Sequence, residues 1–203
     1  MKKYLSILIS LLLIASFGFA GCTAVQKEVV TAEIDIAPIH TITTEIGVLN
    51  LTAYDKDGNV KWQELARLNA LADEGEQLFL NCTLIATGCP TTFYLRLYND
   101  TPVETDTLAL LTGEPSTNGY AACEITRDAT GWPTLALDSG DYMATSSEET
   151  FSASGGSWGP VTYAVLATTS DNTGKLVAYA ALSTSRTLAD GESLKVTYNI
   201  KIQ

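Results

Sequence analysis

The sequence predicts a mainly β protein: an antiparallel β-sandwich, of the jelly-roll or immunoglobulin-like kind, with one amphipathic helix. Residues 161–167 and 176–182 are apolar runs of strand length, and residues 194–202 alternate strictly between apolar and polar side chains. Strict alternation gives that last strand one buried side and one side that faces solvent. Turn residues separate the runs, because Gly, Asn and Asp tolerate tight-turn geometry: Gly155-Gly156, Asp171-Asn172-Thr173-Gly174 and Asp190-Gly191.

The chain begins with a leader that is typical of exported proteins. Two lysines precede an apolar run at 5–14, and small residues precede Cys22. The segment Phe-Ala-Gly-Cys at 19–22 resembles a bacterial lipobox, in which the cysteine is lipidated, although Phe19 stands where leucine is usual. We therefore expect a signal peptide at 1–21 and a lipid on Cys22 that anchors the exported protein at the cell envelope. An uncleaved membrane anchor is the alternative, because about twenty residues just span a bilayer.

Residues 22–40 are predicted to be an N-terminal arm or tether. Alternation in T-A-E-I-D-I-A at 31–37 favours a short strand, and Pro38 restricts that strand to a sheet edge or ends it. Such an arm has the pattern to add to the edge of a neighbouring sheet. The only histidine, His40, has no second histidine with which to share a metal ion, so we expect a loop or a hydrogen-bonded strand residue there.

Residues 41–203 are predicted to form a single domain, which opens with a β-hairpin around the turn D-K-D-G-N at 55–59. This turn resembles the start of a calcium loop, but Gln63 and Glu64 come too early to supply the closing ligand. Apolar side chains then recur at helical spacing. They predict one amphipathic helix near 63–80 that covers a sheet.

Three cysteines remain for this domain once Cys22 carries a lipid. Cys82 and Cys89 flank a short loop, and an oxidising compartment permits them to form a disulfide between the helix end and the next strand. Free thiols and a zinc site are the alternatives, and zinc has the weakest support because the Cys-x-x-Cys spacing is absent and His40 is remote. The role of Cys123 is open.

Short strands fill the rest of the domain. Alternation at 92–97, a strand at 120–126 and apolar residues at 135–143 bring the expected total to about nine to eleven strands. A polar excursion at 105–117 interrupts them. Four aromatic side chains are expected in the core, with an exposed ligand-binding platform as the alternative: Tyr120, Trp132, Trp158 and Tyr163.

Composition and motifs argue against several functions. Twenty-three acidic and twelve basic residues give a net charge of −11, which repels a phosphate backbone, so we expect no nucleic-acid partner. The sequence has no nucleophile elbow, metalloprotease helix or phosphate-binding loop. Carboxylates recur in pairs, at Asp138 with Asp141 and at Glu148 with Glu149, but in polar turns where solvation is expected, so a glycosidase would depend on composition alone. We predict no enzyme, no cofactor and no metal.

Two blocks of sequence resemble small virion structural proteins of tailed phages, of the head-decoration or tail-fibre-like kind. The first is A-Y-D-K-D-G-N-V-K-W at 53–62, with N-A-L-A-D-E-G at 69–75. The second runs from G-G-S-W-G-P-V-T-Y at 155–163 to A-L-S-T-S-R-T-L-A-D-G-E-S-L-K-V-T-Y-N-I at 181–200. These are turn and core patterns. The resemblance implies a β fold and a structural role, with partner contacts in a freely varying loop at 105–117.

Two functions follow from these observations. The resemblance favours a non-enzymatic structural or decoration protein of phage-virion type, which self-assembles or docks on a surface lattice and has copies of itself or other virion proteins as partners. The leader favours an envelope-anchored lipoprotein that binds an extracellular ligand or partner, because virion proteins normally assemble in the cytoplasm. A prophage-borne surface protein, or a virion fold reused on the envelope, satisfies both. The expected location is accordingly the cell envelope or, alternatively, the virion.

Overall fold

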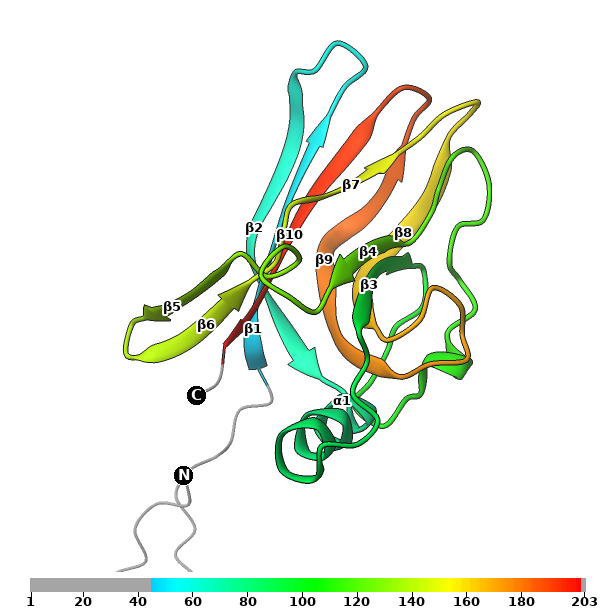
Figure 1. Ribbon diagram of the computed structural model, residues 1–203. Helices are drawn as coiled ribbons and strands as arrows, with labels where there is room; N and C mark the ends of the chain where they lie inside the picture. The colour runs from blue at the N-terminus through cyan, green and yellow to red at the C-terminus, as the bar shows by residue number, and fades with distance from the viewer. Residues whose placement is uncertain (1–44, 202–203) are drawn as a thin grey trace, which may run out of the picture. The chain divides into compact units, whose positions relative to one another are not determined.

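The computed structural model describes residues 45–201, all of which belong to one compact unit (Figure 1). The predicted signal peptide, Cys22, the predicted arm and His40 lie outside the described residues. The mainly β, antiparallel class with one α-helix is confirmed for this range. Its strands are β1 (Glu45–Tyr54), β2 (Val60–Leu71), β3 (Thr92–Tyr98), β4 (Cys123–Thr126), β5 (Thr134–Asp138), β6 (Asp141–Thr145), β7 (Glu149–Ser152), β8 (Trp158–Ala167), β9 (Leu176–Leu188) and β10 (Ser193–Lys201), and its helix is α1 (Asp73–Leu80).

The strands form one antiparallel sheet that curls on itself. Its order is β4-β3-β8-β9-β2-β1-β10-β6-β5, and β7 pairs with β10 beside this path. β10 changes partner along its length, because its first half pairs with β7 and its last three residues pair with β6. The curl brings β7 next to β4, where the Cys123 thiol lies 3.6 Å from the Thr150 carbonyl oxygen. The predicted sandwich therefore takes the form of a single curled sheet.

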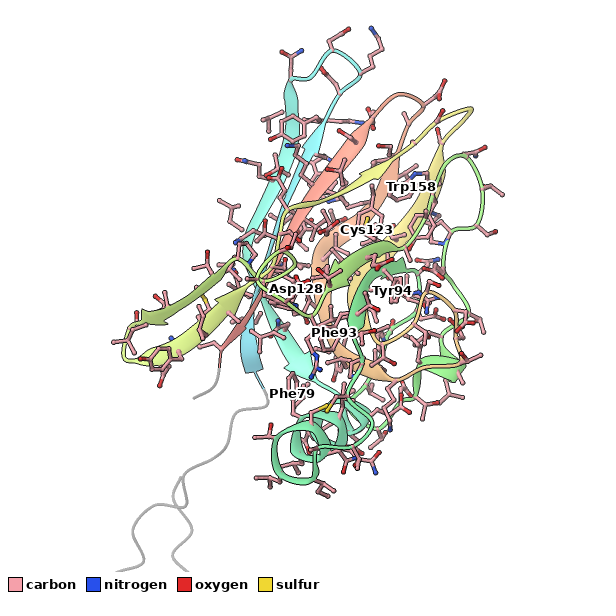
Figure 2. The ribbon with its side chains drawn as sticks, viewed as in Figure 1. Phe79, Phe93, Tyr94, Cys123, Asp128 and Trp158 are labelled. Atoms are coloured by element: carbon pink, nitrogen blue, oxygen red, sulfur yellow. The ribbon has the colours of Figure 1, made fainter. Side chains whose placement is uncertain are left out.

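The inner face of the curl holds the main apolar core. Leu194, Val196 and Tyr198 of β10 alternate into it, as the sequence predicts, and all three are fully buried. Phe151 of β7, which pairs with Leu194, and Trp158 of β8 belong to the same cluster; Figure 2 labels Trp158. Burying one large aliphatic or aromatic side chain contributes about 1.5–3 kcal/mol, so this cluster is the main source of stability.

Three of the four aromatic residues chosen from the sequence belong to or pack against this core. Trp158 is buried, and Tyr120 packs edge to face against it with ring centroids 5.3 Å apart. Trp132 packs edge to face against Phe93 with ring centroids 6.1 Å apart. Tyr163 is half-buried and lies beside another tyrosine outside this cluster. The core interpretation therefore describes these side chains better than an exposed platform does.

A second, smaller cluster lies on the outer face of β8. Val165 and Ala167 alternate with the inward-facing residues of that strand and are buried in this separate cluster. Leu108 and Leu111, from the segment expected to be a polar excursion, cover them and are themselves buried. Leu108 and Leu111 therefore attach the segment at 105–117 to the outer face of β8, because they are buried in the same cluster as Val165 and Ala167.

The structure corrects the predicted helix near 63–80. α1 begins only at Asp73, and the residues before it belong to β2. A β-bulge explains the misleading pattern. Ala66 has a φ of 53°, and the pairing of β1 with β2 shifts register across it, because Leu49 pairs with Arg67 and Leu51 with Glu64. The bulge breaks the two-residue period, so Leu65 and Leu68 fall at helical spacing although both are exposed, at 63% and 56%.

Candidate assembly surface

The hairpin of β5 and β6 carries three large, exposed apolar side chains on one face of the sheet. It projects from the curled part of the sheet (Figure 1). Leu135 pairs with Ala144, and Leu137 pairs with Tyr142. Directly opposed residues of an antiparallel pair point to the same side, so these four form one apolar face. Leu135 is 72% exposed, and Leu137 and Tyr142 are each 64% exposed.

This apolar face continues the core-facing side of β10. Ile200 lies two residues beyond the buried Tyr198, on the same side of the strand, and packs against the core. It also pairs with Ala144 of β6. The core-facing side of the sheet therefore runs on into the hairpin, where its leucines remain exposed. A contiguous apolar surface of this kind is typical of a site that a partner covers.

The hairpin is built rigidly enough to present this face. Its two-residue turn has positive φ at both positions, 54° at Ser139 and 103° at Gly140, which is the geometry of a type I′ turn. The Nζ atom of Lys201, in β10, lies 3.4 Å from a carboxylate oxygen of Asp138 and 3.6 Å from one of Asp141. The two carboxylates that the sequence offers as a pair thus share one lysine, which ties the hairpin tip to β10.

The outer edge of β5 is also available for pairing. β5 is the last strand in the sheet order, and within residues 45–201 no strand pairs with its second edge. All five of its residues are exposed. Unpaired backbone N–H and C=O groups along such an edge form a template for another strand. The same short strand therefore combines a free edge with an uncovered apolar face.

A second apolar patch lies where α1 ends. Leu80, Leu84 and Ile85 are exposed around a shallow hollow. Asp73 and Glu76 stand on its rim. This patch has three large exposed apolar side chains, as the hairpin face does, but it has no free strand edge beside it.

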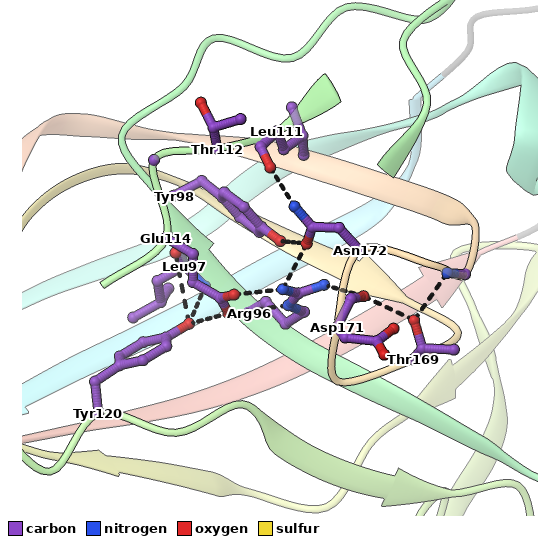
Figure 3. Close-up of polar contacts among 12 residues, drawn as sticks. Arg96, Leu97, Tyr98, Leu111, Thr112, Glu114, Tyr120, Thr169, Asp171 and Asn172 are labelled. Atoms are coloured by element: carbon purple, nitrogen blue, oxygen red, sulfur yellow. Dashed lines mark hydrogen bonds and ion pairs between the residues drawn. The ribbon is translucent and has the colours of Figure 1, made fainter. Parts of the chain in front are cut away.

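A buried polar network holds the two loops behind β3 (Figure 3). Arg96, only 2% exposed, donates from Nε to the Glu114 carboxylate at 2.9 Å, from Nη1 to the Asp171 carbonyl oxygen at 2.7 Å and from Nη2 to the Asn172 side-chain oxygen at 2.8 Å. Burial alone would lower the pKa of Arg96, but the hydrogen bond to Glu114 and the negative charge there raise it above its ordinary value. The guanidinium therefore stays charged.

Tyr120 closes the network on its other side. Its hydroxyl donates to Glu114 at 2.8 Å and accepts from the Leu97 amide at 2.8 Å. Burial, followed by the nearby Glu114 carboxylate, raises the pKa of Tyr120, so the phenol stays protonated. Each of these groups is used in joining the loops to β3. Sequence analysis missed this network, although one charged residue, Arg96, within the apolar strand F-Y-L-R-L-Y was a visible signal.

The structure places Cys82 and Cys89 near one another as free thiols. Burial, and then a hydrogen bond with Cys89, raises the pKa of Cys82. The bridge between them stays a prediction. Cys123 lies apart on β4 (Figure 2), where burial, with Glu149 as the second cause, raises its pKa to about 12. In the part of the chain that the structure describes, no three His, Cys, Asp or Glu side chains are grouped to hold a metal ion.

Between residues 45 and 201, no helix has the length and hydropathy needed to cross a membrane. A protein-family model, described as podophage GP4 fiber I protein gp80, matches residues 70–201. The matched region runs from the end of β2 through β10, so it contains both the hairpin and the Arg96 network. A search of curated proteins found no match.

Proposed function

The chain belongs to the podophage GP4 fiber I protein gp80 family, and from this membership we propose that it is a non-enzymatic virion subunit that docks onto copies of itself or onto other virion proteins. The match spans more than half of the chain. Family membership supports a phage structural protein of fibre type. The docking step is carried by one observation, the uncovered apolar face of the β5–β6 hairpin.

The polar groups of the domain support a structural role as well. The buried charged residue Arg96 is satisfied by Glu114 and by two loop groups, and Tyr120 is satisfied by the same carboxylate. A catalytic group needs an approach for substrate, whereas these contacts use the side chains to fix loops. The rigid curled sheet is then a support that presents the hairpin.

Particle composition tests this function. Gradient-purified particles from the phage or prophage that encodes the chain should contain peptides from residues 45–201. The paired substitution Leu135→Ser with Leu137→Ser should reduce incorporation, because it removes two of the four side chains of the apolar face without touching the core. The paired substitution Leu65→Ser with Leu68→Ser is the matched control, since both are also exposed leucines, at 63% and 56%, on another element, β2. Absence of the parent protein from particles, with its recovery in the host membrane fraction, would overturn the proposal.

An envelope-anchored lipoprotein that binds an extracellular partner is the second candidate. The observation that favours it is the leader, with its lipobox-like segment at 19–22. Labelling with a radioactive fatty acid separates the two candidates. Label on the parent protein that is lost in Cys22→Ser, together with absence from particles, would support the envelope function.

A further inference from the structure

We propose that the β5 strands of two copies pair edge to edge, antiparallel and centred on Ala136, and so join two hairpins into one sheet of order β6-β5-β5-β6. This inference rests on the proposed docking function and names its partner as a second copy of the chain. The free edge of β5 provides the unpaired backbone groups for this ladder. The exposed face of the same strand provides the apolar contact.

The strand T-L-A-L-D is self-complementary in this register. With Ala136 opposite itself, Leu135 of one copy lies opposite Leu137 of the other, and Thr134 lies opposite Asp138. Opposed residues share a face, so the four leucines gather on one side of the joined sheet. That side is the continuation of the core-facing side of β10. Pairing therefore sets Leu135 of each copy beside Leu137 of the other and buries part of the apolar surface that each copy leaves exposed.

Charge selects the antiparallel arrangement. Asp138 and Asp141 lie at the hairpin tip, and the whole chain carries a net charge of −11. In the antiparallel register the two tips point to opposite ends of the joined sheet, which keeps these carboxylates apart. A parallel, in-register pair would set Asp138 beside its own copy, and like charges directly opposite one another destabilise a strand pair.

The occupant must match both features of β5 at once. A strand that pairs with this edge and continues this apolar face needs apolar side chains at alternate positions and a small or polar residue between them, which β5 itself provides. Two five-residue strands make a small contact compared with about 800 Å² per partner in a stable interface. We therefore expect a concentration-dependent dimer, which multivalent attachment to a particle would strengthen.

Disulfide trapping tests the register directly. In the full-length chain, purified in a nonionic detergent, Ala136→Cys should form a covalent dimer on mild oxidation, because opposed Cα atoms in an antiparallel pair are about 4.5–5.5 Å apart, within disulfide reach. Thr134→Cys is the matched control on the same strand. Its own copy would be four residues out of register, about 14 Å away along the sheet.

Yield and connectivity decide the outcome. Covalent dimer from Ala136→Cys at about tenfold the yield of Thr134→Cys, with peptides linked at position 136, supports the pairing. Equal yields from the two variants, or no dimer above that of the parent, overturn it. Light scattering should also show that Leu137→Ser shifts the dimer toward monomer whereas Leu65→Ser, at an equally exposed leucine of β2, does not, and equal thermal melts would show that both variants are folded.

The crosslinking experiment and the particle experiment distinguish failure of the β5 pairing from failure of the virion function. A chain that is present in particles but shows no register-specific crosslink refutes the β5 pairing and leaves the virion function standing. A crosslinked dimer that is absent from particles supports the pairing and refutes the virion function.

Discussion

The buried pair of Arg96 and Glu114 offers the sharpest test of what holds the loops behind β3. Glu114→Ala removes the carboxylate and leaves a guanidinium, 2% exposed at its side chain, without its counter-ion. Breaking a buried pair in this way costs about 3–5 kcal/mol. The Glu114 side chain is 19% exposed, so water can partly replace its contacts in the variant. We therefore expect the free energy of unfolding to fall by about 3 kcal/mol.

Thermal and chemical unfolding measure this loss. For a chain of this size, each 1 kcal/mol shifts the melting temperature by about 2–4 °C, so Glu114→Ala should melt about 6–12 °C below the parent. The urea midpoint should fall while the m-value stays constant, because the buried surface of the fold is retained. Hydrogen exchange should rise first in the loop around Leu111, whose carbonyl accepts from Asn172 in the same network.

Glu148→Ala is the matched control, because it makes the same chemical change at an exposed ion pair. Glu148 lies 2.5 Å from Lys195, with exposed fractions of 53% and 39% for the two side chains. Exposed pairs contribute about 0–1 kcal/mol. Equal losses of stability in Glu114→Ala and Glu148→Ala would show that the buried pair stabilises the fold no more than the exposed pair does, and would refute the reasoning.

Three further predictions concern Asp128, the Cys82–Cys89 pair and Cys22. Hydrogen bonds from the Gly131 amide and its neighbours hold the pKa of Asp128 below its usual range, so its contribution is present above about pH 4 and is lost as pH falls through the lowered value. Asp128→Asn should therefore lower the melting temperature at pH 7 and converge with the parent in acid. Oxidised protein should yield a linked Cys82–Cys89 peptide in a non-reduced digest and gain about 2–3 kcal/mol, whereas free thiols at both positions in envelope-purified protein would contradict the bridge. Cys22→Ser should abolish fatty-acid labelling and release the protein from membranes, and an unlabelled parent would contradict lipidation.

Strand identity was predictable where the buried face is strictly periodic. Leu194, Val196 and Tyr198 are two residues apart and all reach the core, because a strand turns alternate side chains to opposite faces. The turn at 55–59 was predictable for a local reason. The Asp55 carboxylate accepts the Asn59 amide at 2.8 Å, and the sequence of the turn contains both partners.

The first half of the predicted helix failed because a bulge changes the period. The backbone at Ala66 turns through positive φ, and its amide is held by the Asn50 side chain at 2.9 Å. That partner lies in β1, so the sequence of β2 alone contains no sign of the bulge. Glu64 adds a contact of the same kind, since it accepts from the Ser183 amide at 2.6 Å across to β9.

The candidate assembly surface shows why a pattern predicts a strand more readily than its surroundings. The alternation at Leu135 and Leu137 predicts a strand with one apolar side, and β5 has that side. Whether the side is covered depends on how far the rest of the sheet extends over it, and here the curl that closes over β10 ends before it reaches the hairpin. In a core, such leucines contribute only to folding. On β5 they remain exposed after folding is complete, and in the proposed pairing their contact contributes to the association of copies.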